Sequence, residues 1–169
     1  MSHESHLEIE RVWLARACPE LPRHAKRLVI HQGYCAPPKT GRLRMTTFDD
    51  GRRSFVHTLK TGEGLVRHET EHALSEAEFQ QAWPATEGQR LSKTRWRVDE
   101  GELTWEIDVF DEIDLVLAEV ELPTVLTSVS IPVWLAGVVE REVTEEKAYR
   151  NFALVGRHLT HGHPKPWIG

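Results

Sequence analysis

Charged residues recur two positions apart in six short segments spread over almost the whole chain. These residues are Glu8 and Glu10; Arg42 and Arg44; Arg67, Glu69 and Glu71; Lys93, Arg95 and Arg97; Glu106 and Asp108; and Glu119 and Glu121. In a β-strand, residues two apart point to the same face, and apolar residues mostly hold the opposite face here. If the polar faces converge, they enclose a site lined by both signs of charge. Such a site suits a polyanion accompanied by divalent cations.

The composition narrows the class of protein. A chain of 169 residues is long enough for one domain with a real core. The net charge of −5 argues against non-specific nucleic-acid binding, which usually needs a basic face, so we expect no nucleic-acid partner. Cys18 and Cys35 form neither a disulfide framework nor a thiolate zinc site, which favours the cytoplasm. The stretch 125–139 contains Pro132 and is too short for a membrane helix, so we expect no membrane span.

Eight segments are predicted to be strands. They cover about 7–13, 26–34, 41–48, 54–60, 65–73, 90–98, 102–110 and 115–122. Turn sequences such as Asp49-Asp50-Gly51 and Asp99-Glu100-Gly101 join many of them, which is typical of antiparallel hairpins. The pattern predicts a single α+β domain built on an eight-stranded antiparallel β-barrel with flanking helices.

Two helices are predicted outside the sheet. Ser75 and Glu78 form a capping box that begins a short helix reaching about Trp83. Thr144 is expected to cap a second helix, whose inner face would carry residues 148, 152 and 155. The segment 158–169 contains Pro and Gly and is predicted to be a flexible tail.

An ordered series of motifs from Leu7 to about Leu154 resembles the CYTH family, the triphosphate tunnel metalloenzymes, and the expected CYTH domain covers residues 1–157. The motifs are Glu8-Ile9-Glu10-Arg11-Val12 at the family's ExExK signature, QGY at 32–34, RLR at 42–44, TLK at 58–60, RHETE at 67–71, KTRW at 93–96, WEIDVF at 105–110, AEVEL at 118–122 and EVTEEKAYRN at 142–151. WPATEG at 83–88 further resembles the small bacterial branch. The resemblance implies a tunnel of eight antiparallel strands that binds triphosphate groups with Mg²⁺ or Mn²⁺.

The charged residues can be assigned roles on this basis. Hard divalent ions take oxygen ligands, so carboxylates are the candidates to hold the metal. The resemblance to the family implies the same carboxylates. The expected metal ligands are Glu8, Glu10, Glu119 and Glu121, with Asp108 beside them. The expected phosphate ligands are Arg42, Arg44, Lys60, Arg67, Lys93 and Arg95, because guanidinium and ammonium groups bind phosphate oxygens. Lys93 and Glu69 are the candidates for catalysis, although Glu69, Glu71, Glu106 and Asp108 could instead hold the cations in place.

The expected reaction is hydrolysis of inorganic triphosphate, and a homodimer is also expected. Thiamine triphosphate or another organic triphosphate is an alternative substrate, because a fold does not decide among them. A second alternative is a protein that binds polyphosphate or a nucleotide without turnover, since Val12 stands where the family has lysine. The two-residue alternation places Arg97 on the inner face of its strand, so Arg97 is a candidate to supply the positive charge that Val12 lacks.

His68-Glu69-Thr70-Glu71-His72 also matches H-E-x-x-H, the signature of zinc metalloproteases. That chemistry needs a helix, because only there do positions four apart converge on one metal. On a strand both histidines lie on the face opposite Glu69 and Glu71. The expected third ligand would have to come from His158, His161 or His163 in the tail.

Overall fold

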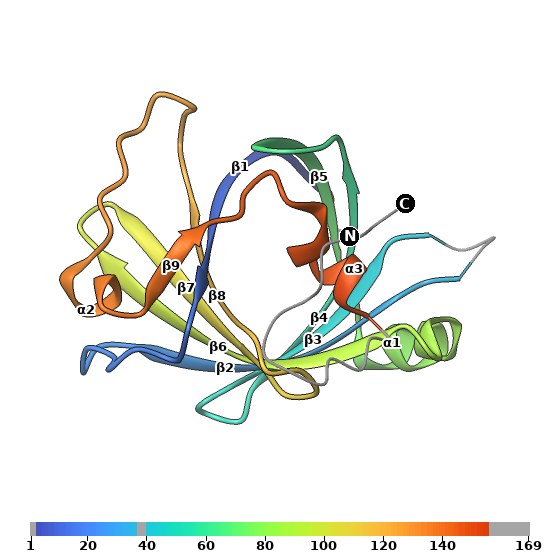
Figure 1. Ribbon diagram of the computed structural model, residues 1–169. Coiled ribbons are helices and arrows are strands. Elements are labelled where there is room, and N and C mark those ends of the chain that lie inside the picture. Colours follow the sequence, from blue (N-terminus) through green and yellow to red (C-terminus); the bar gives the residue numbers. More distant parts are fainter. Residues whose placement is uncertain (1–2, 37–39, 156–169) are drawn as a thin grey trace.

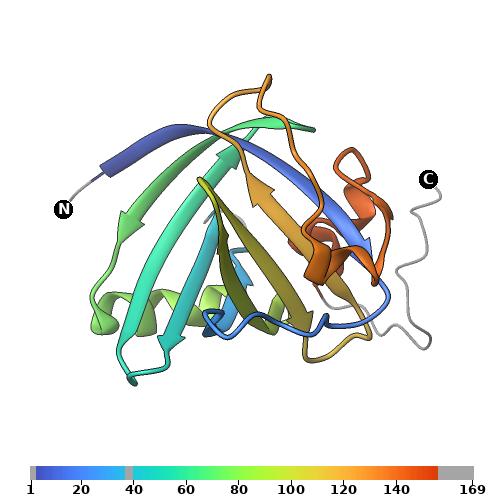
Figure 2. The ribbon, with the colours of Figure 1, turned by 90° about the vertical axis from the view of Figure 1, so that its left-hand side faces the viewer.

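The protein is a closed antiparallel β-barrel, as the alternating pattern predicts (Figures 1 and 2). The computed structural model describes residues 3–36 and 40–155. The barrel strands are β1 (His3–Ala15), β2 (Lys26–Tyr34), β3 (Arg42–Phe48), β4 (Arg53–Thr61), β5 (Val66–Ala73), β6 (Arg90–Glu100), β7 (Leu103–Phe110) and β8 (Val116–Glu121). All eight predicted strands are present, although their ends differ by a few residues. The predicted tail 158–169 and the expected boundary at 157 lie outside the described residues.

Strand β1 closes the barrel by pairing along both of its edges. Its second half, residues 10–15, pairs with β8, and its first half, residues 3–9, pairs with β5. A ninth strand, β9 (Val139–Glu142), adds to the edge of β1 at Trp13 and Leu14. The sequence analysis missed β9 because its four residues are mostly exposed and show no apolar alternation.

The first predicted helix forms as expected. α1 (Glu76–Ala82) begins at Ser75, whose hydroxyl accepts a hydrogen bond from the Glu78 backbone N–H, and the Glu78 carboxylate accepts one from the Ser75 backbone N–H. The 3-10 helix η1 (Trp83–Thr86) follows it directly. Phe79 is buried and packs its ring 5.1 Å from that of Phe55 on β4. α1 therefore covers the outer wall of the barrel.

The second predicted helix is wrong. Residues 144–155 form two short pieces, the 3-10 helix η2 (Lys147–Tyr149) and α3 (Asn151–Leu154), separated by Arg150 in an extended conformation. Thr144 caps no helix, because its hydroxyl accepts a hydrogen bond from the backbone N–H of Val12 instead. A contact with a distant strand thus outweighs the local capping signal. The segment lies across one end of the barrel (Figure 1).

Two apolar clusters hold the barrel in shape. The first covers the outer face of β1, β7 and β8, where Trp13 and Trp105 are buried beneath the long segment that contains α2 (Val133–Ala136). The second fills the barrel interior at the end where β1 finishes. It includes Leu14, Leu117 and Tyr149. The barrel interior is therefore apolar at this end, and its charged residues lie further along the axis.

No helix in the part of the chain that the structure describes is long and apolar enough to cross a membrane.

Candidate functional site

The charged strand faces converge on one large cavity inside the barrel. The cavity has a volume of about 900 Å³. All of the predicted inward-facing charged residues line it except Lys93 and Asp108: Glu8, Glu10, Arg42, Arg44, Lys60, Arg67, Glu69, Glu71, Arg95, Arg97, Glu106, Glu119 and Glu121. The strand parity read from the sequence therefore places these side chains correctly. A polar cavity of this size has room for a small polyanion.

Four glutamates from β1 and β8 crowd one wall of the cavity. Glu10 pairs in register with Glu121, and Val12 with Glu119. Burial, followed by the charges of Glu119 and Glu8, raises the pKa of Glu10 well above its usual value. Burial is also the main cause that raises the pKa values of the other three carboxyls. Carboxylates in this state need a cation or a proton between them.

Arginines from β3 and β5 give another part of the cavity a positively charged surface. Arg44 donates two hydrogen bonds to the Gln32 side-chain carbonyl, at 3.0 and 2.8 Å, and Arg42 donates one to the Thr58 hydroxyl at 3.3 Å. Burial, with the nearby charges of Arg42 and Arg95, lowers the pKa of Arg44 to about 9. The Nε atoms of Arg42 and Arg67 are buried and have no hydrogen-bond partner among the described residues. These donors are available to an anion.

Lys60 joins the two surfaces. Its Nζ lies 2.9 and 2.8 Å from the two carboxylate oxygens of Glu8 and 3.1 Å from Oε2 of Glu69. The Lys60–Glu69 contact is close enough for an ion pair, but Glu69 Oε2 lacks a hydrogen bond of good geometry. The contact between Lys60 and Glu69 is therefore electrostatic.

Lys93 and Asp108 lie behind the cavity wall. Lys93 is fully buried, and its Nζ donates to Asp108 at 2.6 Å and to the Asn151 side chain at 2.8 Å. Asp108 also accepts two hydrogen bonds from Arg95, at 2.7 and 2.8 Å. Burial lowers the pKa of Lys93 to about 8. Burial alone would raise the pKa of Asp108, but Arg95 and Lys93 outweigh it and hold that pKa far below its usual range.

Comparisons with known proteins agree with this geometry. The chain is 37% identical over 153 residues to an inorganic triphosphatase of Nitrosomonas europaea, and the match spans 87% of this chain and 95% of that protein. The protein belongs to the CYTH family of triphosphate tunnel metalloenzymes. No family model matches the sequence in a separate scan.

Solved structures support the same CYTH assignment. The crystal structure of an inorganic triphosphatase matches with a TM-score of 0.58 and 30% identity, over 89% of this chain and 95% of that one. A protein of Pyrococcus horikoshii matches with a TM-score of 0.51 over 69% of this chain and 78% of its own. At 20% identity, the Pyrococcus match shows the fold alone.

The four-glutamate wall fits a divalent metal of the kind that CYTH proteins use. Oxygen-only donors suit a hard cation, and burial, with the charges of neighbouring carboxylates, raises the pKa values of Glu10 and Glu119, a cost that a bound cation would relieve. Among the described residues, no three His, Cys, Asp or Glu side chains already converge at ligand distance. An ion held by one or two carboxylates, water and phosphate oxygens is the usual arrangement for magnesium. The residues present therefore fit the metal.

The zinc-protease reading is wrong. Residues 68–72 belong to strand β5, so His68 and His72 do not converge as they would on a helix. His68 is exposed, and the His72 ring packs 5.9 Å from that of His57. The tail histidines 158, 161 and 163 lie outside the described residues.

The sequence analysis overlooked several cavity residues of the CYTH fold. Tyr34, Thr58, Arg150 and Asn151 all line the cavity. Tyr34 and Thr58 lie on the inner faces of their own strands, as Arg42 and Arg44 do on β3. The two-residue alternation of each strand could therefore have found them. Arg150 and Asn151 belong to the segment wrongly predicted as one helix; the shared motif at 142–151 contains both, but strand alternation does not signal their position.

Two further cations, Lys147 and Arg97, lie near the mouth of the site or outside it. Lys147 does not line the cavity, because its ammonium group pairs with Glu63 at 2.9 Å and both side chains are exposed. Arg97 lines the cavity but is about half exposed, and it contacts Glu106 at 3.6 Å.

Proposed function

We propose that this protein hydrolyses inorganic triphosphate with the help of a divalent cation, either Mg²⁺ or Mn²⁺. The observation that carries the proposal is the cavity itself, in which crowded glutamates face arginines whose buried N–H groups lack partners. The similarity to an inorganic triphosphatase of Nitrosomonas europaea supports the choice of substrate. No disulfide joins Cys18 to Cys35, which supports a reducing compartment such as the cytoplasm.

The proposed binding mode assigns each surface of the cavity to one partner. Arg42, Arg44, Arg67 and Lys60 bind phosphate oxygens, and Arg95 contributes from the cavity wall. Glu8, Glu10, Glu119 and Glu121 hold the metal. A bound divalent cation would neutralise the phosphate oxygens and stabilise the charge that develops on the leaving diphosphate.

The proposed reaction is attack by water on a terminal phosphorus atom. One new P–O bond forms, the bond to the bridging oxygen breaks, and the products are phosphate and diphosphate. Glu69 is the proposed residue that orients the water and accepts its proton, because Glu69 lines the cavity and its Oε2, 3.1 Å from Lys60, makes no well-formed hydrogen bond among the described residues.

Lys93 and Asp108 take a positioning role in this proposal. Neither residue lines the cavity, so neither is assigned to phosphate or metal. Both Asp108 oxygens already accept hydrogen bonds from Arg95. The buried pair therefore fixes the direction in which the Arg95 guanidinium points into the cavity.

A substrate panel tests the proposal. Release of phosphate is measured from tripolyphosphate, pyrophosphate, thiamine triphosphate and ATP, each with Mg²⁺, with Mn²⁺ and with EDTA. We expect metal-dependent release, fastest from tripolyphosphate. Faster release from thiamine triphosphate or ATP would reassign the substrate, and saturable binding without release would identify a sensor. Light scattering on the same sample tests the expected homodimer.

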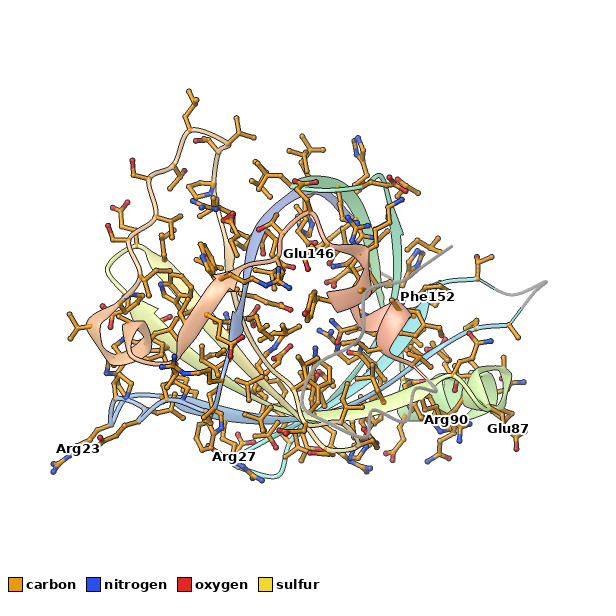
Figure 3. All side chains as sticks on the ribbon, viewed as in Figure 1. Arg23, Arg27, Glu87, Arg90, Glu146 and Phe152 are labelled. Atoms are coloured by element: carbon orange, nitrogen blue, oxygen red, sulfur yellow. The ribbon has the colours of Figure 1, made fainter. Side chains whose placement is uncertain are left out.

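Two variants connect the activity to the cavity. Glu119→Gln should abolish turnover, because it removes a charge from the proposed metal site. Glu87→Gln is the matched control, since Glu87 lies on the outside of the barrel (Figure 3). Wild-type turnover by Glu119→Gln at limiting metal would contradict the metal assignment.

A further inference from the structure

The C-terminal segment is attached to the edge of β1 at the position where the family signature departs. The backbone N–H of Val143 donates to the Val12 carbonyl at 2.8 Å, and the Val12 N–H donates to the Thr144 hydroxyl at 3.0 Å. The Val12 side chain packs against the inner apolar cluster that contains Tyr149. Val12 also lines the cavity, so a lysine at position 12 would carry its charge into the cavity and could not pack against this cluster in the same way. Val12 is therefore part of the seat on which the segment docks.

The same segment is also held by the turn between β4 and β5. Lys147 pairs with Glu63 in that turn. Glu145 lies directly over Gly64, where a Cβ atom would come within 2.5 Å of a Glu145 carboxylate oxygen. Gly64 has a positive φ of 74°, a backbone conformation that favours glycine. The segment thus contacts the β4–β5 turn, while its hydrogen bonds with Val12 attach it to β1.

This docking brings Arg150 to the cavity beside Arg67. Arg150 lines the cavity, as do Glu146 and Phe152 of the same segment, which are labelled in Figure 3. Burial and then the like charge of Arg67 lower the pKa of Arg150. Within the described residues, neither guanidinium makes a hydrogen bond or ion pair, and Arg67 Nε is a buried donor without a partner. Two adjacent cations with free donors are stabilised by an anion placed between them.

We propose that Arg150, together with Arg67, binds a phosphate group of the substrate and supplies the positive charge that position 12 lacks. This inference rests on the proposed function. Arg97, the other candidate for this charge, is about half exposed and already contacts Glu106. Arg150 instead enters from a separate segment, and Val12 contributes by holding that segment in place. The cation that replaces the missing lysine thereby comes from the C-terminal segment and not from strand β1.

Substitution of Arg150 tests the proposal. The affinity for diimidotriphosphate, which resists hydrolysis, is measured by calorimetry with Mg²⁺, and KM is measured with tripolyphosphate. We expect Arg150→Gln to weaken binding and raise KM by about tenfold to a hundredfold, the loss of one charge-assisted hydrogen bond. Arg150→Lys should recover part of the affinity, because it restores the charge without the planar fork.

Lys147→Gln is the control for attachment of the segment. It removes a cation from the same segment and breaks its exposed pair with Glu63, but it does not touch the cavity. We expect little change, since exposed ion pairs contribute little. An equal loss in Lys147→Gln, or unchanged binding in Arg150→Gln, would overturn the role of Arg150.

The outcomes separate this inference from the proposed function. Hydrolysis by the wild type with unchanged binding in Arg150→Gln leaves the function standing and refutes the inference. Wild-type binding without hydrolysis, weakened in Arg150→Gln, refutes the enzyme and supports the inference. A wild-type protein that neither binds nor hydrolyses triphosphate refutes both.

Discussion

Replacement of Asp108 by asparagine should destabilise the protein more than any other single loss of charge in the barrel. Asp108 is fully buried and accepts three charge-assisted hydrogen bonds, one from Lys93 and two from Arg95. Asparagine keeps the size of the side chain but removes the negative charge. Two buried cations would then share no central counter-ion.

The size of the effect follows from how each cation can respond. Lys93 can lose its proton: its pKa is about 8 beside ionised Asp108, and loss of that charge lowers it further, so deprotonation costs at most about 1 kcal/mol at pH 7. Arg95 cannot lose its proton, although it keeps its contacts with Glu106 and Glu119. Breaking a buried ion pair by removing one partner typically costs about 3–5 kcal/mol, and we expect that loss here.

The assay is urea unfolding of the wild type and Asp108→Asn at pH 7 and pH 9. A lysine with a lowered folded-state pKa opposes folding while it is charged, so the Lys93 contribution to stability improves as pH rises from about 8 toward 10.5. At pH 9 Lys93 is largely neutral in the wild type too, and the difference between the proteins should shrink by about 1 kcal/mol. Asp114→Asn, at an exposed position, is the control.

Equal free energies of unfolding for wild type and Asp108→Asn, within about 0.5 kcal/mol, would refute the reasoning. If Asp108→Asn does not fold, the double variant with Lys93→Met keeps the test open. The double variant leaves only Arg95, which keeps its contacts with Glu106 and Glu119, instead of Arg95 and Lys93 together, so it should be more stable than Asp108→Asn.

Three further predictions follow from the cavity and its surroundings. Protons and metal compete for Glu10 and Glu119, whose pKa values are raised in the folded protein. The metal-free protein therefore gains stability as the pH falls through these pKa values, because the carboxyls become neutral. The gain in Tm from added Mg²⁺ should consequently be larger at pH 7.5 than at pH 5. A larger gain at pH 5 would place the metal elsewhere. Val12→Lys should lower the affinity for triphosphate, because it disturbs the packing that holds the Arg150 segment; higher affinity would show that the lysine reaches the substrate. A His68→Ala, His72→Ala double variant should keep triphosphate hydrolysis and zinc content unchanged, since residues 68–72 form a strand. Stoichiometric zinc in the wild type that this variant loses would contradict the strand reading.

The amino-acid sequence determines the walls of the barrel. Alternation at Glu8 and Glu10, or Arg42 and Arg44, needs only the two-residue period of a strand, so the facing of these side chains follows from local geometry. The capping box at Ser75 is equally local, because both of its hydrogen bonds lie within one turn of α1. The ordered motifs, taken together, then indicate the CYTH family.

Only the tertiary structure decided what lies at each level of the barrel and what covers its end. Parity puts Lys93 and Asp108 on the inner face, but it cannot show that the interior is closed off there by packed side chains. Thr144 resembles a helix cap until the distant backbone of Val12 takes its hydroxyl. Arg150 reaches the cavity through contacts with β1 and the β4–β5 turn, which lie far from it in sequence. Such long-range contacts leave no periodic signal in the chain, because they depend on how already formed strands and turns meet in space.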